Sequence, residues 1–194
     1  MRAASRFTVM LFTVRELLLH DVEFNEAYAA GAIDLGPELR QQRPLEAKGR
    51  AALIEEHRGG REGTVRDIRV IGSLATQVEV SCARCLEAIT HEVKRQFDLL
   101  YRPLGVDRRA DEVAIHEADT EIGYYAGDGL PLEDVLREQV LLEVPIKSVC
   151  REDCRGLCLQ CGRNLNRESC DCAPALNDER WNALRDLKDK LQGR

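Results

Sequence analysis

The spacing of eight cysteines is the feature that most constrains this 194-residue chain. Six form the pattern C-x3-C-x3-C-x2-C-x8-C-x-C between Cys150 and Cys172, and two form a separate C-x-x-C pair at Cys82 and Cys85. A C-x-x-C turn brings two sulfurs to one side of a tight loop, and zinc binds four thiolates tetrahedrally at about 2.3 Å. The pattern therefore predicts a site for zinc, or a similar thiophilic metal, near the C-terminus.

The segment Cys158-Leu-Gln-Cys161-Gly162 is expected to form one half of that site. A glycine after the second thiol permits the positive φ that such a turn commonly needs. Cys170 and Cys172 then offer the opposing pair of sulfurs. An iron–sulfur cluster also accepts four thiolates, and spacing alone does not distinguish the two.

Clustered cysteines can also form disulfides, and whether they do depends on the redox state of the cellular compartment. The first residues, MRAASRFTVMLFTV, superficially resemble a signal peptide, but the apolar stretch ends at Arg15 and Glu16 with no convincing cleavage site close behind. No apolar run is long enough to cross a membrane. We therefore expect a cytoplasmic protein without membrane contact, in which clustered thiols more often bind metal than pair with one another.

The pair at Cys82 and Cys85 follows a predicted strand. A redox C-x-x-C typically opens a helix, which lowers the thiol pKa, and no helix is expected here. Two schemes remain open. In one, two zinc ions are bound by two groups of four: Cys82, Cys85, Cys150 and Cys154; and Cys158, Cys161, Cys170 and Cys172. In the other, one zinc ion occupies a C-terminal site and the remaining cysteines are free.

Hydrophobic patterning predicts an α+β fold. From residue 45 to 101 the chain reads as three long strands, with clear alternation through Val65, Ile68 and Val70, and with Gly72 marking a bulge or sharp bend. Short turns between them indicate an antiparallel β-meander or small open barrel. A last short strand is expected over residues 121–125, and Ile33–Leu35 is a further candidate.

A helix is expected to begin near Asp128 or Gly129, to hold Pro131 in its first turn and to end at Pro145. Its apolar face, broad enough to cover one side of the sheet, comprises Leu132, Val135, Leu136, Val140 and Leu142. Residues 103–120 read as an acidic loop, and a terminal helix follows the cysteines. The predicted domains are residues 1–44, an N-terminal arm; 45–147, an antiparallel β domain with its covering helix; and 148–194, a cysteine-rich zinc module with a C-terminal helix.

Two strings of this sequence carry a family resemblance: VEVSCARCLE, and VPIKSVCREDCRGLCLQCGRNLNRESCDC downstream. Together they resemble the DUF177 or YceD family of large ribosomal RNA accumulation proteins, from about residue 10 to the end. One departure is Leu159-Gln160, where a proline would be expected after the first thiol. The resemblance implies a non-enzymatic factor for 23S ribosomal RNA accumulation and large ribosomal subunit assembly.

The implied partner is the pre-ribosomal large subunit, through either 23S rRNA or a ribosomal protein, with no small-molecule substrate. A net charge of −6 and a pI of about 5.4 disfavour RNA binding by a whole basic face. Arginines on a rigid metal-held turn could still contact phosphate, and the weak candidates are Arg155, Arg163 and Arg167.

An enzyme is not expected. Catalytic zinc usually keeps an open position and often uses histidine or carboxylate ligands, whereas the four histidines of this chain are scattered. The alternative function is a thiol-based redox or metal-sensing adaptor that uses Cys82 and Cys85.

Overall fold

The computed structural model describes residues 10–58, 63–106 and 122–172, together with 188 and 190. The chain divides into two compact units. The first, here called the sheet unit, comprises Met1–Val80 and Ile89–Ile146. The second, here called the cysteine unit, comprises Ser81–Ala88 and Lys147–Arg194. The chain therefore enters the cysteine unit twice, once between two strands and once after a helix.

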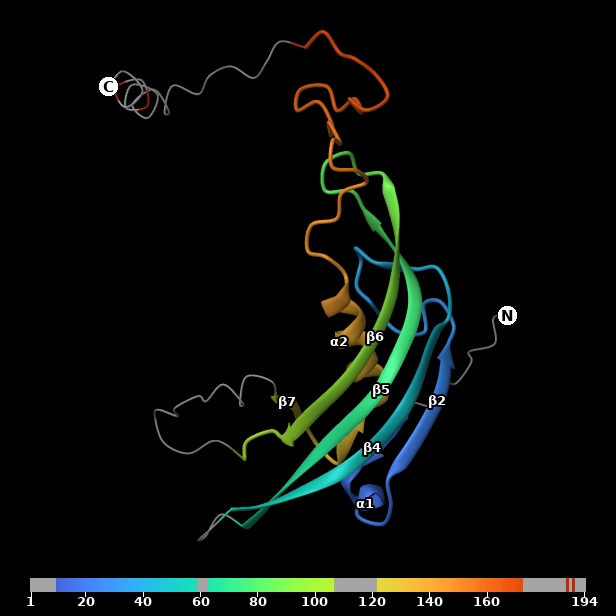
Figure 1. Ribbon diagram of the computed structural model, residues 1–194, viewed down its shortest axis with the longest axis vertical. Coiled ribbons are helices and arrows are strands. Elements are labelled where there is room, and N and C mark those ends of the chain that lie inside the picture. Colours follow the sequence, from blue (N-terminus) through green and yellow to red (C-terminus); the bar gives the residue numbers. More distant parts are fainter. Residues whose placement is uncertain (1–9, 59–62, 107–121, 173–187, 189, 191–194) are drawn as a thin grey trace. The chain divides into compact units, whose positions relative to one another are not determined.

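The sheet unit contains one large sheet whose strands have the order β2-β4-β5-β6-β7, with β3 paired to β5 outside that order (Figure 1). A two-stranded sheet of β1 and β8 and two helices complete the described elements. The bounds are β1 Leu11–Thr13, α1 Val14–Leu17, β2 Val22–Tyr28, β3 Arg40–Gln41, β4 Leu45–Arg58, β5 Gly63–Ser81, β6 Ala88–Pro103, β7 Ile122–Tyr125, β8 Gly129–Pro131 and α2 Leu132–Glu143.

The α+β, sheet-rich class predicted from the sequence is confirmed, and the three long strands are β4, β5 and β6. β4 pairs with β5 and β2 pairs with β4, both antiparallel. β7 joins β6 in parallel, so the sheet is mixed rather than wholly antiparallel. The sheet is open, because β2 and β7 end the order of strands. The side chains of β5 alternate as expected, with Ile68, Val70 and Leu74 buried on one face.

Gly72 does not mark a bulge between β4 and β5, contrary to the sequence-based expectation. The ladder continues without an extra residue on either side of the pair Gly49↔Gly72. A Cβ on Gly49 would lie 2.7 Å from Phe24 Cζ, and a Cβ on Gly72 would lie 3.0 Å from Phe97 Cζ. The atom nearest to either Cβ is a backbone oxygen of the paired strand, Ile71 O for Gly49 and Lys48 O, at 2.7 Å, for Gly72. The glycines are therefore needed because the paired backbone and two buried aromatic rings leave no room for a side chain.

Replacing Gly72 with alanine is expected to destabilise the sheet unit by about 1–3 kcal/mol, because the added methyl group must displace Phe97 or the backbone. Denaturant unfolding followed by far-UV circular dichroism measures this cost. Ser73→Ala, at the neighbouring position of β5, is the matched control and should change stability by less than about 0.5 kcal/mol. Equal stability of the two variants would contradict the proposed ring contact.

Helix α2 covers one face of the sheet, as its sequence predicts (Figure 1). It begins at Leu132 rather than near Asp128 or Gly129, because Gly129–Pro131 form β8, and Pro131 is its N-cap rather than part of its first turn. Four of the five expected apolar residues are buried: Leu132, Val135, Leu136 and Val140. The fifth, Leu142, was expected to be buried but is 62% exposed, two residues beyond Val140, the last buried residue of the helix. Arg95 of β6 donates hydrogen bonds to Gln139 Oε1 at 2.7 Å and to Glu143 Oε2 at 2.9 Å, which ties helix to sheet.

A buried ion pair also belongs to the sheet unit. Arg102 of β6 donates to Asp67 of β5, with Nη2 2.9 Å from Oδ2 and Nε 3.1 Å from Oδ1. The side chains of Arg102 and Asp67 are 9% and 3% exposed. Glu56 of β4 accepts a further 2.9 Å bond from the same guanidinium.

Several other expectations differ from the structure or lie outside its described part. β2 was not expected, yet it pairs with β4 along its whole length within the first 44 residues. Ile33–Leu35 is not a strand, although Ile33 and Leu35 are buried against the core. Most of the expected terminal helix and most of the acidic loop lie outside the described residues. No described helix is both long and apolar enough to cross a membrane.

Candidate metal centres

The cysteine unit is built on two turns with the same backbone hydrogen bonds. In the first, Leu86 N donates to Cys82 O at 3.0 Å, and Cys82 N donates to Glu87 O at 2.8 Å. This turn places Leu86 at a φ of 61°, and Leu86 is the only non-glycine residue with positive φ in the described part of the chain. A leucine in this left-handed conformation costs about 1–2 kcal/mol, so its surroundings must hold the turn in place.

The second turn repeats the first at Cys158. Gly162 N donates to Cys158 O at 2.9 Å, and Cys158 N donates to Arg163 O at 2.8 Å. Gly162 has a φ of 72°, which confirms the role expected for this glycine. Each C-x-x-C pair therefore forms the same tight loop, with its two thiols close together. Leu159, which stands where a proline was expected, does not prevent this turn.

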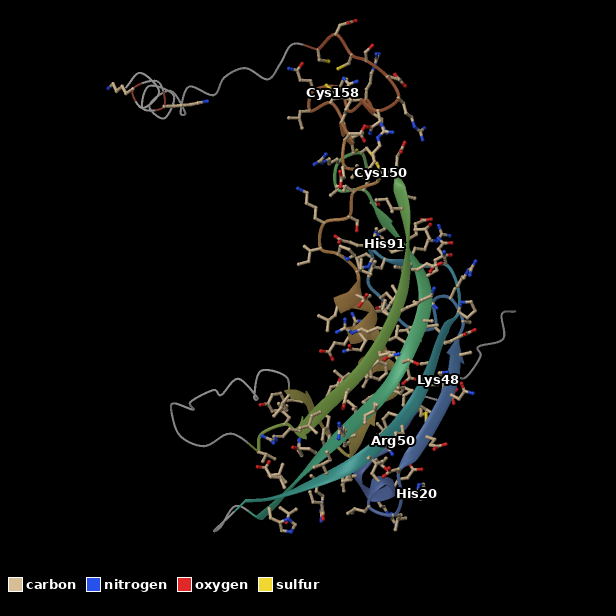
Figure 2. All side chains as sticks on the ribbon, in the orientation of Figure 1. His20, Lys48, Arg50, His91, Cys150 and Cys158 are labelled. Atoms are coloured by element: carbon tan, nitrogen blue, oxygen red, sulfur yellow. The ribbon has the colours of Figure 1, made fainter. Side chains whose placement is uncertain are left out.

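The two turns gather the eight cysteines into two groups of four, here called site 1 and site 2. Site 1 comprises Cys82, Cys85, Cys150 and Cys154; site 2 comprises Cys158, Cys161, Cys170 and Cys172. Figure 2 labels Cys150 of site 1 and Cys158 of site 2. Within each group all sulfurs lie within 4.8 Å of one another. This grouping is the one that the two-site scheme describes.

The sulfur spacing fits a tetrahedral thiolate site. In site 1, Cys82 Sγ lies 3.9 Å from Cys154 Sγ, and Cys85 Sγ lies 3.7 Å from Cys150 Sγ. Four sulfurs placed about 2.3 Å from a central zinc ion would be separated by roughly 3.8 Å. All eight cysteines are free, so neither group is closed by disulfides. Each group could therefore hold one metal ion, and four thiolates would complete its coordination.

Site 1 joins segments that are far apart in sequence, and hydrogen bonds inside the cysteine unit hold them together. Arg84 donates from Nη1 to the carbonyl oxygens of Glu152 and Cys154, both at 2.9 Å. Leu157 N donates to Arg84 O at 3.0 Å. A Cβ on Gly156 would lie 3.0 Å from that same oxygen, which explains the glycine. Arg84 thus links the two halves of site 1 through hydrogen bonds, a role that the sequence did not reveal.

Each group contains at least one thiol that ionises easily, and in site 1 the pKa of Cys154 is also lowered, because hydrogen bonds outweigh burial. Backbone N–H groups of Cys85, Arg84 and Cys150 point at the Cys82 sulfur and lower the pKa of this thiol to about 6. In site 2 the N–H groups of Cys161 and Gln160 do the same for Cys158, whose pKa is also lowered to about 6. A metal ion entering either group would therefore meet at least one sulfur that favours the thiolate form near neutral pH.

One thiol in each group, Cys150 in site 1 and Cys172 in site 2, behaves oppositely. Partial desolvation of its sulfur, together with the neighbouring Cys154, Cys85 and Cys82, raises the pKa of Cys150 to about 12, although the residue as a whole is exposed. In site 2 the hydrogen bond that the Cys172 thiol donates to Cys161, followed by burial, raises the pKa of Cys172 to about 12. Four thiolates in contact repel one another, so full ionisation of either group needs a bound cation.

Metal binding is therefore expected to weaken as the pH falls. The pKa of the Cys82 and Cys158 thiols is lowered from 9.0 to about 6, so both side chains are mainly thiolates above pH 6. Below pH 6 protons compete with the metal for these sulfurs and displace it. Near neutral pH each ion should release about two to three protons. A chromophoric chelator added across a pH series measures retention, and unchanged retention from pH 8 to pH 5 would contradict thiolate ligation.

The three arginines proposed as weak nucleic-acid contacts differ in their surroundings. Arg167 forms a 2.6 Å ion pair with Glu87, which offsets its charge. Arg155 and Arg163 are exposed, and each follows a cysteine turn or ligand closely in sequence. The structure thus leaves Arg155 and Arg163 better placed than Arg167 to meet a partner.

Asn166 is a further residue that the sequence did not single out. Its Nδ2 donates to Cys154 Sγ at 3.3 Å, and its Oδ1 accepts from Arg155 N at 2.8 Å. It lies between Cys161 and Cys170 in the sequence. No local pattern identifies it, because its sulfur partner belongs to the other site.

Together, the sheet and the two groups of four thiols define a mixed α+β protein with a separate cysteine unit suited to structural metal ions. The family described as "Large ribosomal RNA subunit accumulation protein YceD" matches residues 70–188, which include both sites. The chain belongs to this family, as its two sequence strings indicated.

Two plant relatives carry the same description. A chloroplastic "Large ribosomal RNA subunit accumulation protein YCED homolog 1" of Arabidopsis thaliana is 27% identical over 148 residues, 66% of this chain and 46% of the relative. Its Zea mays counterpart is 28% identical over 130 residues, 55% of this chain and 44% of the relative. The match thus spans less than half of either plant protein.

A bacterial relative is also similar. An uncharacterized protein of Mycobacterium tuberculosis is 31% identical over 136 residues, 68% of this chain and 63% of the relative. No solved structure matches the chain.

Proposed function

We propose that this chain is a non-enzymatic factor that supports 23S rRNA accumulation and large ribosomal subunit assembly, with zinc as a structural element at sites 1 and 2. Family membership carries the ribosomal part of the proposal, since the plant relatives are named for large-subunit rRNA accumulation. The two groups of four thiols support a structural role for zinc, because four protein ligands leave the ion no position for a substrate.

The partner is the pre-ribosomal large subunit, reached through its RNA or through a ribosomal protein. Residues 81–88 and 147–172 of the cysteine unit carry six basic and five acidic side chains. A zinc ion bound by four thiolates adds a net charge of −2, so the loaded unit is acidic overall. Any RNA contact must therefore be local, and the exposed Arg155 and Arg163 are the candidates for it.

The cellular test is depletion of the protein in its host. We expect the ratio of 23S to 16S rRNA to fall and large-subunit particles to decrease in sucrose gradients. Re-expression of the wild type should restore both, whereas Cys82→Ser/Cys158→Ser should not. Normal rRNA ratios and subunit profiles after verified depletion would overturn the proposed function.

The direct RNA test is a gel shift with 23S rRNA fragments across a salt series. Two arginine–phosphate contacts predict a slope of log K against log salt of about −2 at most, which Arg155→Gln/Arg163→Gln should abolish. Arg69→Gln, an exposed arginine in the sheet unit, is the control. No shift even at low salt would exclude direct RNA recognition and leave a ribosomal protein as the partner.

The second candidate function is a redox or metal-sensing adaptor that uses Cys82 and Cys85. The lowered pKa of Cys82 favours it, since thiolates are the reactive form. Burial opposes it, because Cys82 is 0% and Cys85 is 4% exposed. Fast alkylation of these two thiols in the metal-loaded protein would support the adaptor; labelling only after chelation would support a structural site.

A further inference from the structure

The loop between Cys161 and Cys170 connects the two halves of site 2, yet its hydrogen bonds reach site 1. Asn166 lies within this loop and donates from Nδ2 to Cys154 Sγ, a sulfur of site 1, at 3.3 Å. Its Oδ1 accepts from Arg155 N at 2.8 Å and from Arg151 Nη2 at 2.9 Å. One side chain of the site 2 loop thus contacts a site 1 sulfur and the backbone beside it.

The side chain of Asn166 is itself fixed by neighbours in the same loop. Asn164 Oδ1 accepts from both Asn166 N at 3.0 Å and Asn166 Nδ2 at 2.9 Å. Asn164 in turn donates from Nδ2 to Glu87 Oε1 at 3.0 Å, and Glu87 follows the first cysteine turn. Both asparagines therefore link the site 2 loop to the segments that carry the site 1 sulfurs.

We propose that Asn166 couples the two sites, so that metal binding at site 2 strengthens metal binding at site 1, and the reverse. The inference rests on the metal sites of the proposed function. An ion at site 2 holds Cys161 and Cys170 together and thereby closes the loop that presents the Asn166 amide. That amide donates to a site 1 thiolate, which stabilises its charged form and fixes its direction. By thermodynamic linkage, site 1 must support site 2 equally.

The test measures site 1 alone and site 1 beside an intact site 2. Cys158→Ser/Cys161→Ser disables site 2 without touching Asn166 or any site 1 ligand. The full-length chain is stripped of metal and titrated with Zn²⁺ against a competing chelator. Losing a hydrogen bond to a metal ligand typically weakens binding 10- to 100-fold, so we expect site 1 affinity to fall by about that factor.

Asn166→Asp then tests the residue itself. The aspartate keeps the size of the side chain but loses the Nδ2 donor and adds a negative charge near Cys154. We expect site 1 affinity to fall about 10- to 100-fold, and disabling site 2 in addition to cost little more. Asn25→Asp, which makes the same chemical change on the exposed strand β2, is the control and should leave the affinity unchanged.

Cobalt spectroscopy separates coupling from a general loss of structure. With Co²⁺ bound at site 1, the sulfur-to-cobalt charge-transfer band reports the electron density on the sulfurs, and it should shift when the donor to Cys154 is removed. Wild-type site 1 affinity in both Asn166→Asp and Cys158→Ser/Cys161→Ser would overturn the coupling while leaving the two zinc sites intact. A wild-type chain that binds fewer than two ions would overturn both.

Discussion

Removing the metal with a chelator is expected to unfold the cysteine unit while the sheet unit stays folded. Among the described residues of the cysteine unit, the buried side chains that could form a core are Cys82, Cys85 and Cys154. Between residues 147 and 172 its regular structure consists of turns and one isolated bridge, Leu157↔Asn164. A unit whose interior is sulfur has little apolar area to bury, so metal binding must supply its folding free energy.

The expected size of this effect is large. Structural zinc sites bind with apparent free energies of about 10–16 kcal/mol at neutral pH, comparable to the stability of a whole domain. The measurement is hydrogen exchange on the loaded and the stripped protein, with metal content followed by elemental analysis. Amides of Cys82, Leu86, Cys158 and Gly162, which donate to backbone carbonyls in the turns, should lose protection.

The sheet unit provides the internal control. Amides of β4 and β5, which pair along thirteen consecutive positions, should keep their protection in the stripped protein. Adding Zn²⁺ back should restore protection in the turns, and two ions per chain are expected at saturation. Turn amides that stay protected in fully stripped protein would show that metal does not hold this unit together.

The second large effect is expected in the sheet unit, at the buried pair of Arg102 and Asp67. Replacing Arg102 with methionine leaves the Asp67 carboxylate buried without its partner, since Asp67 is 3% exposed as a side chain. Breaking one side of a buried pair typically costs about 3–5 kcal/mol. Denaturant unfolding should therefore show a loss of this size for Arg102→Met.

Two further variants decide whether charge burial is the cause. The double variant Arg102→Met/Asp67→Leu removes both charges and should recover most of the lost stability. Glu56, whose side chain is 48% exposed, can be hydrated without Arg102. Arg69→Met breaks an exposed bidentate pair with Asp98 and should cost about 1 kcal/mol or less. Equal losses for Arg102→Met and Arg69→Met would contradict the argument.

The strands could be predicted where one face is consistently apolar, and not elsewhere. β5 alternates clearly and was expected, as was β7. β2 was missed because only Phe24 and Tyr28 of its seven side chains are buried, and its charged residues resemble those of a loop. Conversely, Ile33 and Leu35 are buried without forming a strand, since burial of apolar side chains does not require a ladder.

The sequence correctly singled out Gly72 as a special position in its strand, but the structural reason differs from the expected bulge. A glycine inside a strand indicates either a bulge or a close approach, and sequence spacing cannot distinguish them. The close approach depends on Phe24 and Phe97, which come from two other strands. Leu142 shows the same limit for the helix, because helical spacing reveals which residues share a face and not how far along the helix that face stays buried.

The cysteine turns are the part of the candidate site that the sequence determined by itself. A C-x-x-C loop closes through hydrogen bonds between residues four and five apart, so its geometry is local and follows from spacing and Gly162. Cysteine counting suggested the two groups of four but could not choose between one site and two. That choice involves sulfurs 65 and 72 residues apart, which no local pattern encodes. Only the tertiary structure joins Cys82 and Cys85 to Cys150 and Cys154, and only it brings Asn166 to the sulfur of a neighbouring site.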